Sequence, residues 1–306
     1  MDGAEAVTED ERPLWRRIVD YPLVAMVIAT IVYIAAIALA VAVGKSAPQS
    51  LGKVPVAAIQ SAITIALLYA AYKAIIVRLG ERPRDDLPLG PALRDGAIGL
   101  GAGFALMAVS VGVAAVLGIY RITGPGDTSR LLLELIMVAI MPGFTEELLF
   151  RGILFRWIEE FGGSWLALLV TSALFGLAHI LNPNATWFSS FAIAVEAGVL
   201  LGGCYMLTRN LWLAMGLHAG WNFTQGEIFD VPVSGIDEHG LVQARLSGPE
   251  LLSGGQFGLE ASLICLTIAT VTGIALVICA VRKGHVVRPH WLREPRQHEG
   301  LVRTFG

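Results

Sequence analysis

The sequence PGFTEELLFRG at residues 142–152 places two carboxylates and one guanidinium in an otherwise apolar part of the chain. A charged side chain at bilayer depth costs roughly 2.5 to 3.5 kcal/mol, so such residues persist only where they pair or face a polar interior. If this stretch is an α-helix, Glu147 and Arg151 stand four residues apart on one face and can form an ion pair. Glu146 is rotated by about 100° from Glu147, which leaves it as the unpaired carboxylate.

The two glutamates are therefore expected to have different roles. A buried carboxylate without a cationic partner gains affinity for protons, as a general base must, whereas Arg151 would keep Glu147 ionised and fixed in place. The alternative is that both carboxylates lie at a helix end in the headgroup layer, solvated and inert. Both interpretations are compatible with this segment alone.

The composition of the whole chain is that of an integral membrane protein. Of the 306 residues, 55% are hydrophobic and only 15% are charged, and the mean hydropathy is +0.66. A soluble domain has about 25% charged residues and could not keep so apolar a surface in water. The three cysteines lie in apolar runs without metal-binding spacing and are expected to be core residues. They are Cys204, Cys265 and Cys279.

Runs of about 20 apolar residues recur along the chain and predict an all-α, polytopic membrane helix bundle with about eight transmembrane helices. The fourth run contains Pro142-Gly143 and is too long for a straight crossing, so a broken helix or an interfacial segment is expected there. The seventh run is short for a full crossing. The predicted spans are residues 22–43, 54–77, 97–119, 131–158, 164–182, 187–208, 211–224 and 260–281.

Lys and Arg are concentrated on one side of these spans, mainly in the N-terminal tail of residues 1–21, in the segment 78–94 and in the basic C-terminal tail of residues 282–306. By the positive-inside rule, we expect a multi-pass protein of the cell membrane with both termini in the cytoplasm. The membrane-embedded domain then covers residues 22–281, and its acidic connection at 225–259 lies outside, where it could act as a lid. Attraction to anionic lipid accounts for the basic tail, so no nucleic acid partner is expected.

Two further polar clusters lie on apolar helices. Phe175 and His179 share one face of the fifth predicted span, and His218 and Asn222 share one face of the seventh. A single histidine in such a helix more often forms a structural hydrogen bond, but three helices that each bring a polar cluster favour one common pocket. Glu196, in the sixth span, either lines this pocket or forms a hydrogen bond between helices.

These residue types suit the activation of water. Glu146 would take a proton from a water that His179 also holds, and the resulting hydroxide would attack a peptide carbonyl. His218 and Asn222 could then donate hydrogen bonds to the oxyanion. The sequence therefore predicts no cofactor, with zinc as the alternative because two histidines and a carboxylate are a common zinc site. Against zinc, the helical His-Glu-x-x-His motif is missing.

The motifs Glu-Glu-x-x-x-Arg, Phe-x-x-x-His and His-x-x-x-Asn, in this order on successive apolar helices, closely resemble those of the CAAX prenyl endopeptidase family, also called CPBP or ABI. The resemblance covers residues 131–224, and the segments 233–235 and 254–260 look like those of a subset of bacterial members. It implies catalytic roles for the residues at the matching motif positions, Glu146, His179, His218 and Asn222. It also implies supporting roles for Glu147, Arg151 and Phe175.

The leading interpretation is an intramembrane endopeptidase that hydrolyses a membrane-tethered, prenylated or hydrophobic peptide. Its expected partners are membrane lipid and that substrate, and the oligomeric state is left open. The alternatives are a catalytically silent scaffold or bacteriocin-immunity-type protein, and a proton-coupled transporter, since buried Glu and His also form proton relays. His179 falls near the non-cytoplasmic end of its span, whereas a protease for prenylated cytosolic proteins should open to the cytoplasm.

Overall fold

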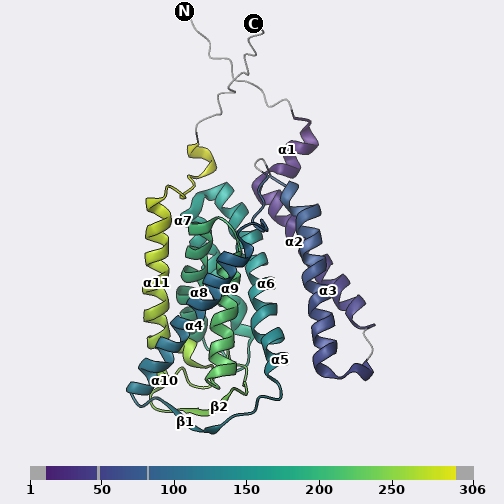
Figure 1. Ribbon diagram of the computed structural model, residues 1–306. Helices are drawn as coiled ribbons and strands as arrows, with labels where there is room; N and C mark the ends of the chain where they lie inside the picture. The colour runs from purple at the N-terminus through teal and green to yellow at the C-terminus, as the bar shows by residue number, and fades with distance from the viewer. Residues whose placement is uncertain (1–11, 47–48, 81–82, 294–306) are drawn as a thin grey trace, which may run out of the picture.

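The computed structural model describes residues 12–46, 49–80 and 83–293. It is a helix bundle with a small two-stranded sheet at one end (Figure 1). The outer parts of the two predicted tails lie outside the described residues. The α-helices are α1 (Leu14–Asp20), α2 (Pro22–Gly44), α3 (Lys53–Ala74), α4 (Ala92–Val116), α5 (Leu131–Glu134), α6 (Met141–Glu147), α7 (Arg156–Ala178), α8 (Trp187–Thr208), α9 (Trp212–Phe223), α10 (Glu250–Ser253) and α11 (Leu263–Arg282).

Shorter elements connect and extend these helices. The π-helical segments are η3 (Leu135–Ile140), η4 (Leu148–Phe155) and η6 (Thr224–Ile228). The 3-10 turns are η1 (Gln49–Leu51), η2 (Ile76–Arg78), η5 (His179–Leu181), η7 (Leu259–Ala261) and η8 (His290–Leu292). The strands are β1 (Tyr120–Pro125) and β2 (Val242–Leu246), which pair antiparallel.

Six helical segments of the described chain are long and apolar enough to cross a membrane, which agrees with the predicted all-α membrane bundle. Eight spans are expected from the sequence, and two features account for the lower number. The predicted spans 131–158 and 164–182 are counted together as the segment Leu131–Leu181, although the helix is interrupted between them at Gly163. The second feature is α9, which has only 12 residues. The count therefore depends on how these two irregular parts of the bundle are treated.

Outward-facing apolar side chains distinguish this bundle from a soluble one. Ile31 on α2 is 60% exposed, and Leu93 and Val116 on α4 are 85% and 89% exposed. Such surfaces are unfavourable in water but suited to contact with lipid. The helices α2 and α3 pack together at one edge of the bundle, beside the segment that carries the Glu-Glu-x-x-x-Arg motif (Figure 1).

The break expected at Pro142-Gly143 is not present, because α6 runs through both residues. Pro142 lies in the first turn of α6, where its missing N–H is tolerated, and π-helical turns before and after α6 keep the segment helical. The helix is interrupted instead at Gly163, whose φ of 82° is accessible to glycine but rare for other residues. This interruption lies between the predicted spans 131–158 and 164–182.

A close helix crossing fixes the position of α9, which carries the His-x-x-x-Asn motif. A Cβ atom added at Gly103 of α4 would lie 2.2 Å from the carbonyl oxygen of Leu217 on α9. Conversely, a Cβ atom added at Gly220 of α9 would lie 2.3 Å from the carbonyl oxygen of Leu100 on α4. Glycines on both helices thus let the two backbones touch, as small residues do in membrane helix pairs.

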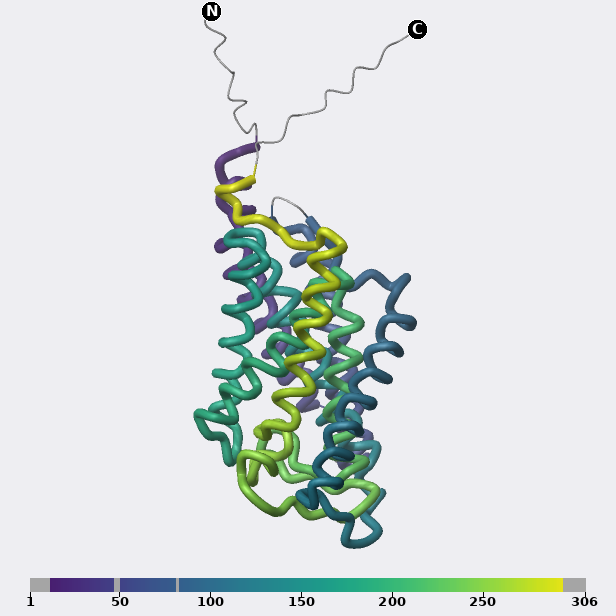
Figure 2. The backbone as a smooth tube through the Cα atoms, turned by 90° about the vertical axis from the view of Figure 1, so that its left-hand side faces the viewer, coloured from purple at the N-terminus to yellow at the C-terminus, as the bar shows by residue number. Residues whose placement is uncertain are grey.

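The predicted long connection at 225–259 is folded, not extended. It contributes β2 to the sheet with β1, and it runs across one end of the bundle between η6 and η7 (Figure 2). The segments α1 and η8, near the two ends of the described chain, lie at the opposite end (Figure 1). The connection therefore covers the bundle end that is remote from the termini.

Candidate active site

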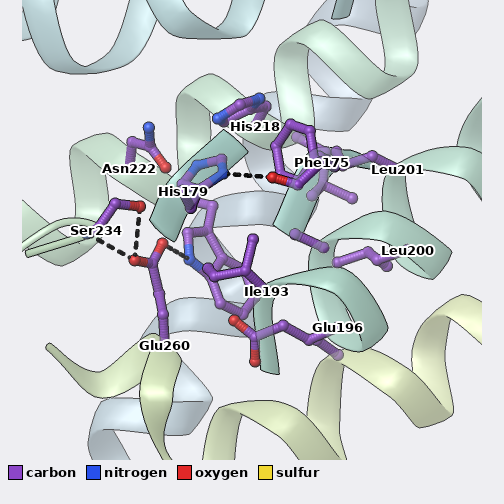
Figure 3. Close-up of a pocket in the computed structure, with 14 residues that line it drawn as sticks. Phe175, His179, Ile193, Glu196, Leu200, Leu201, His218, Asn222, Ser234 and Glu260 are labelled. Atoms are coloured by element: carbon purple, nitrogen blue, oxygen red, sulfur yellow. Dashed lines mark hydrogen bonds between the residues drawn. The ribbon is translucent and has the colours of Figure 1, made fainter. Parts of the chain in front are cut away.

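One pocket contains residues of two of the three motifs together with residues of the 225–259 connection and its neighbourhood. Figure 3 shows His179, His218 and Asn222 on one side of this pocket and Glu196 and Glu260 on the other. Most of the remaining wall is apolar. The lining residues are Phe175, His179, Ile193, Glu196, Ala197, Leu200, Leu201, Leu217, His218, Trp221, Asn222, Ser234, Glu260 and Ala269.

Glu147 and Arg151 form the ion pair that their spacing predicts. Arg151 Nη1 donates to Glu147 Oε1 at 2.7 Å, and both side chains are completely buried. The same carboxylate oxygen lies 3.0 Å from Nδ1 of His218. Glu147 therefore joins the first motif to the third, a contact that spacing along one helix could not predict.

Glu146 lies beside the pocket but is not among its lining residues. It is half-buried, and its Oε2 atom accepts no hydrogen bond from the described residues. It is close enough to His218 to interact with it electrostatically. On the other side, Tyr33 of α2 donates to the carbonyl of Thr145 at 3.2 Å. Glu146 thus has an oxygen available for a water molecule between α2 and His218.

Both imidazoles are oriented through Nδ1. Nδ1 of His179 lies 2.7 Å from the carbonyl oxygen of Phe175, and Nδ1 of His218 lies 3.0 Å from Oε1 of Glu147. A carbonyl or carboxylate oxygen can only accept, so each Nδ1 must carry the proton. Nε2 is then the second functional atom of each ring, an acceptor while the ring is neutral.

Phe175 is the side chain at which the three motifs meet. Its ring centroid lies 4.7 Å from that of His179 and 6.1 Å from that of His218. The Arg151 guanidinium stacks over the same ring at 4.7 Å, a distance that allows a cation–π interaction. Phe150 packs against it edge to face at 4.9 Å. Phe175 therefore spaces the two imidazoles and connects both to the ion pair.

The position of Asn222 depends on Pro142. Proline has no N–H to offer the carbonyl four residues earlier, which here belongs to Val138. Asn222 Nδ2 donates to that carbonyl at 2.9 Å. One amide hydrogen of Asn222 is thereby engaged, and the second remains for another acceptor.

Two carboxylates and a serine of the pocket were not among the predicted site residues. Glu260 Oε2 accepts hydrogen bonds from the backbone N–H of Ser234 at 2.7 Å and from its hydroxyl at 3.0 Å. Trp221 Nε1 donates to Glu260 Oε1 at 3.2 Å. Glu196, left open as either a pocket or a structural residue, lines the pocket, and its Oε2 has no partner among the described residues.

The sequence contained a signal for Glu260 and Ser234, because the segments 233–235 and 254–260 stand out as motifs. It could not place them, because Ser234 lies in the aperiodic connection and Glu260 only at the start of the predicted span 260–281. Burial raises the pKa of Glu260, although the hydrogen bonds from Ser234 oppose this effect. The connection at 225–259 therefore brings a carboxyl group close to both imidazoles.

With the other described residues, His179 and His218 do not form a three-ligand group of the kind that binds zinc. Within residues 12–46, 49–80 and 83–293, only one set of three His, Cys, Asp or Glu side chains has ligand atoms within 4.8 Å of one another. That set is Glu134, Glu227 and Glu238, which lies outside the pocket lining. The zinc interpretation of His179 and His218 would require a rearrangement of these side chains.

Comparison with known proteins identifies the part of the chain that carries the motifs. Residues 128–224 match the family model described as type II CAAX prenyl endopeptidase Rce1-like. Neither the curated proteins nor the solved structures give a significant match. The matched segment runs from just before α5 to the end of α9 and contains all three motifs. The segment that contains the three motifs is thus similar to the CAAX prenyl endopeptidase family.

Proposed function

We propose that the protein is an intramembrane endopeptidase that hydrolyses a peptide bond in a membrane-tethered, hydrophobic peptide. The family match implies a CAAX-type protease. The observation that carries the proposal is the pair of imidazoles in one largely apolar pocket, each held through Nδ1 and each left with Nε2 for chemistry. A protein that used these histidines only for packing would not need to leave both Nε2 atoms available.

In the proposed mechanism, Glu146 removes a proton from a water molecule that His179 Nε2 helps to hold. The hydroxide attacks the peptide carbonyl carbon, and the carbonyl oxygen becomes the oxyanion. The proton on Glu146 then passes to the departing amide nitrogen. No residue of the chain forms a covalent intermediate in this scheme, and no cofactor takes part.

The oxyanion would accept hydrogen bonds from His218 and Asn222. His218 can donate from Nε2 while Nδ1 donates to Glu147 only as an imidazolium. The neighbouring carboxylates of Glu147 and Glu146 would compensate that charge. Asn222 would donate its second amide hydrogen, since the first is engaged by Val138.

We also propose that the pocket opens toward the side of the membrane opposite the termini. His179 ends α7 at the end of the bundle that the 225–259 connection covers, and Ser234 of that connection lines the pocket. If both termini are cytoplasmic, as the charge distribution indicates, the substrate is cleaved in the external half of the membrane. Such a site suits a lipid-anchored or membrane-spanning peptide of the outer leaflet better than a prenylated cytosolic protein.

The test is cleavage of a library of lipidated and unlipidated hydrophobic peptides by the purified protein in detergent. Glu146→Gln keeps the shape of the side chain but removes the base, so turnover should fall by about 10² to 10⁴. Glu250→Gln, an exposed change in α10, serves as the matched control. Wild-type turnover in Glu146→Gln would refute the role of Glu146. A folded wild-type protein that cleaves no peptide of the library would favour the scaffold interpretation.

A further inference from the structure

Three buried carboxylates meet at the end of the bundle that the 225–259 connection covers. Glu134 ends α5, Glu227 lies in η6 and Glu238 lies in the connection before β2. Their side chains contribute oxygen atoms that all lie within 4.8 Å of one another. The three residues are 8%, 0% and 8% exposed, respectively. None of them lines the pocket with the histidines.

The described residues do not balance the charge of this cluster. Arg130 Nη2 binds Glu134 Oε1 at 2.7 Å. Both carboxylate oxygens of Glu227 are buried, and neither accepts a hydrogen bond from a described residue. An unpartnered, completely buried carboxylate is costly, because burial removes its hydration without replacing it. The cluster therefore needs protons or a bound cation to balance its charge.

The raised proton affinities of two members are consistent with that cost. Burial and the nearby carboxylates raise the pKa of Glu227 to about 7 and that of Glu238 to about 8, although Arg130 opposes both shifts. Two further carboxylates are close enough to interact with the cluster electrostatically, Asp230 with Glu227 and Asp237 with Glu238. Asp230 is already occupied. It accepts hydrogen bonds from the backbone N–H groups of Gly240 and Ala244.

The chemistry of the site selects a hard divalent cation. All three ligands are carboxylates, and oxygen ligands are those that Ca²⁺ and Mg²⁺ prefer, whereas Zn²⁺ favours nitrogen and sulfur. Ca²⁺ takes about six to eight oxygen ligands in flexible geometry, whereas Mg²⁺ usually keeps several waters and is bound through one or two carboxylates. Three carboxylates from separate segments therefore fit Ca²⁺ better than Mg²⁺.

We infer that Glu134, Glu227 and Glu238 bind one calcium ion, with water completing the coordination. The ion would join three segments that are far apart in the sequence. Glu134 leads into the helical segment with Glu146, and η6 continues α9. The backbone already brings the third segment close, because Leu241 donates to the carbonyl of Glu227 at 2.7 Å. The inference concerns binding alone and is independent of the proposed protease activity.

The experiment measures calcium binding and thermal unfolding of the purified full-length protein in detergent. Calcium at about 100 times its dissociation constant should raise the melting temperature by roughly 5 to 10 °C. Equilibrium dialysis should find one calcium ion per chain. Magnesium at the same concentration should give a smaller shift. Glu227→Gln should abolish the calcium response, whereas Glu250→Gln, an exposed change in the same connection, should retain it.

Melting temperatures measured with a calcium chelator distinguish a role of Glu227 as a calcium ligand from a merely structural role. Without calcium, Glu227→Gln should melt at or above the temperature of the wild type, because the substitution removes one of three repelling charges. If that variant does not fold, Glu238→Gln provides the same comparison from the connection. An absent calcium shift in the wild type at every pH from 5 to 8.5 would show that protons satisfy the cluster and would overturn the inference. An undiminished shift in both variants would overturn it as well.

Discussion

Replacement of Arg151 by methionine tests whether the Glu147–Arg151 pair is the buried centre of the site. Arg151 is completely buried and donates to Glu147 at 2.7 Å. It also stacks on Phe175 at 4.7 Å and approaches the carbonyls of Ala197 and Gly198 at 3.3 and 3.4 Å. Arg151→Met keeps much of the volume but removes every one of these polar contacts.

The expected magnitude follows from burial. Removal of one partner of a buried ion pair leaves the other charge uncompensated and costs about 3 to 5 kcal/mol. An exposed pair with the same spacing on a helix contributes only about 0.3 to 0.5 kcal/mol. The expected cost of breaking the buried pair is therefore about ten times the contribution of an exposed pair. The loss of the cation–π contact with Phe175 adds about 0.5 to 2 kcal/mol.

A double-mutant cycle isolates the charge effect. Glu147→Gln keeps an amide oxygen that can accept from His218, and the double variant Glu147→Gln/Arg151→Met contains no unpaired charge. Unfolding free energies should be measured by denaturant titration in detergent for the wild type and all three variants. The double variant should be at least about 2 kcal/mol more stable than Arg151→Met alone. A cost below about 1 kcal/mol for Arg151→Met, or equal stability of the single and double variants, would refute the reasoning.

Four further predictions concern the helix crossing, the oxyanion site, the absence of zinc from the mechanism and the orientation. Gly103→Ala would place a methyl group 2.2 Å from the carbonyl oxygen of Leu217, so both the melting temperature and the activity should fall. Gly101→Ala is the control, because no atom lies within 4 Å of its new Cβ, and it should have little effect on either quantity. Asn222→Ala should lower turnover by about 10² to 10³ with little change in substrate affinity, the usual loss for one oxyanion donor. Activity should persist in a strong chelator of zinc; stoichiometric zinc and chelator-sensitive cleavage restored by added metal would reassign the histidines as ligands. Reporter fusions at both tails should be cytoplasmic and fusions within 225–259 external, and an external C-terminal reporter would reverse the proposed orientation of the pocket.

Local spacing was sufficient to predict the contacts within single helices. The Glu147–Arg151 pair forms because residues four apart on a helix face each other whatever surrounds them. The same argument identified Glu146 as the carboxylate outside this pair. The apolar runs predicted the membrane bundle because a helix in lipid must cover its own backbone with apolar side chains.

Contacts between helices were decided only by the tertiary structure. The contact of Glu147 with His218 joins residues 71 positions apart and depends on the glycine crossing of α4 and α9. The break expected at Pro142-Gly143 is absent because π-helical turns on both sides of α6 keep the segment helical. No periodicity constrains the path of the 225–259 connection.

That connection accounts for most of what the sequence could not place. Glu260 reaches the pocket and Glu238 reaches the carboxylate cluster because the connection folds back over the end of the bundle. By itself, the sequence determined which side chains are too costly to bury without a polar partner or a polar cavity, since that cost depends only on the residue type and on the apolar surroundings. Which of these side chains meet was decided by packing, because a partner 30 or 100 residues away is brought close only by the path of the folded chain.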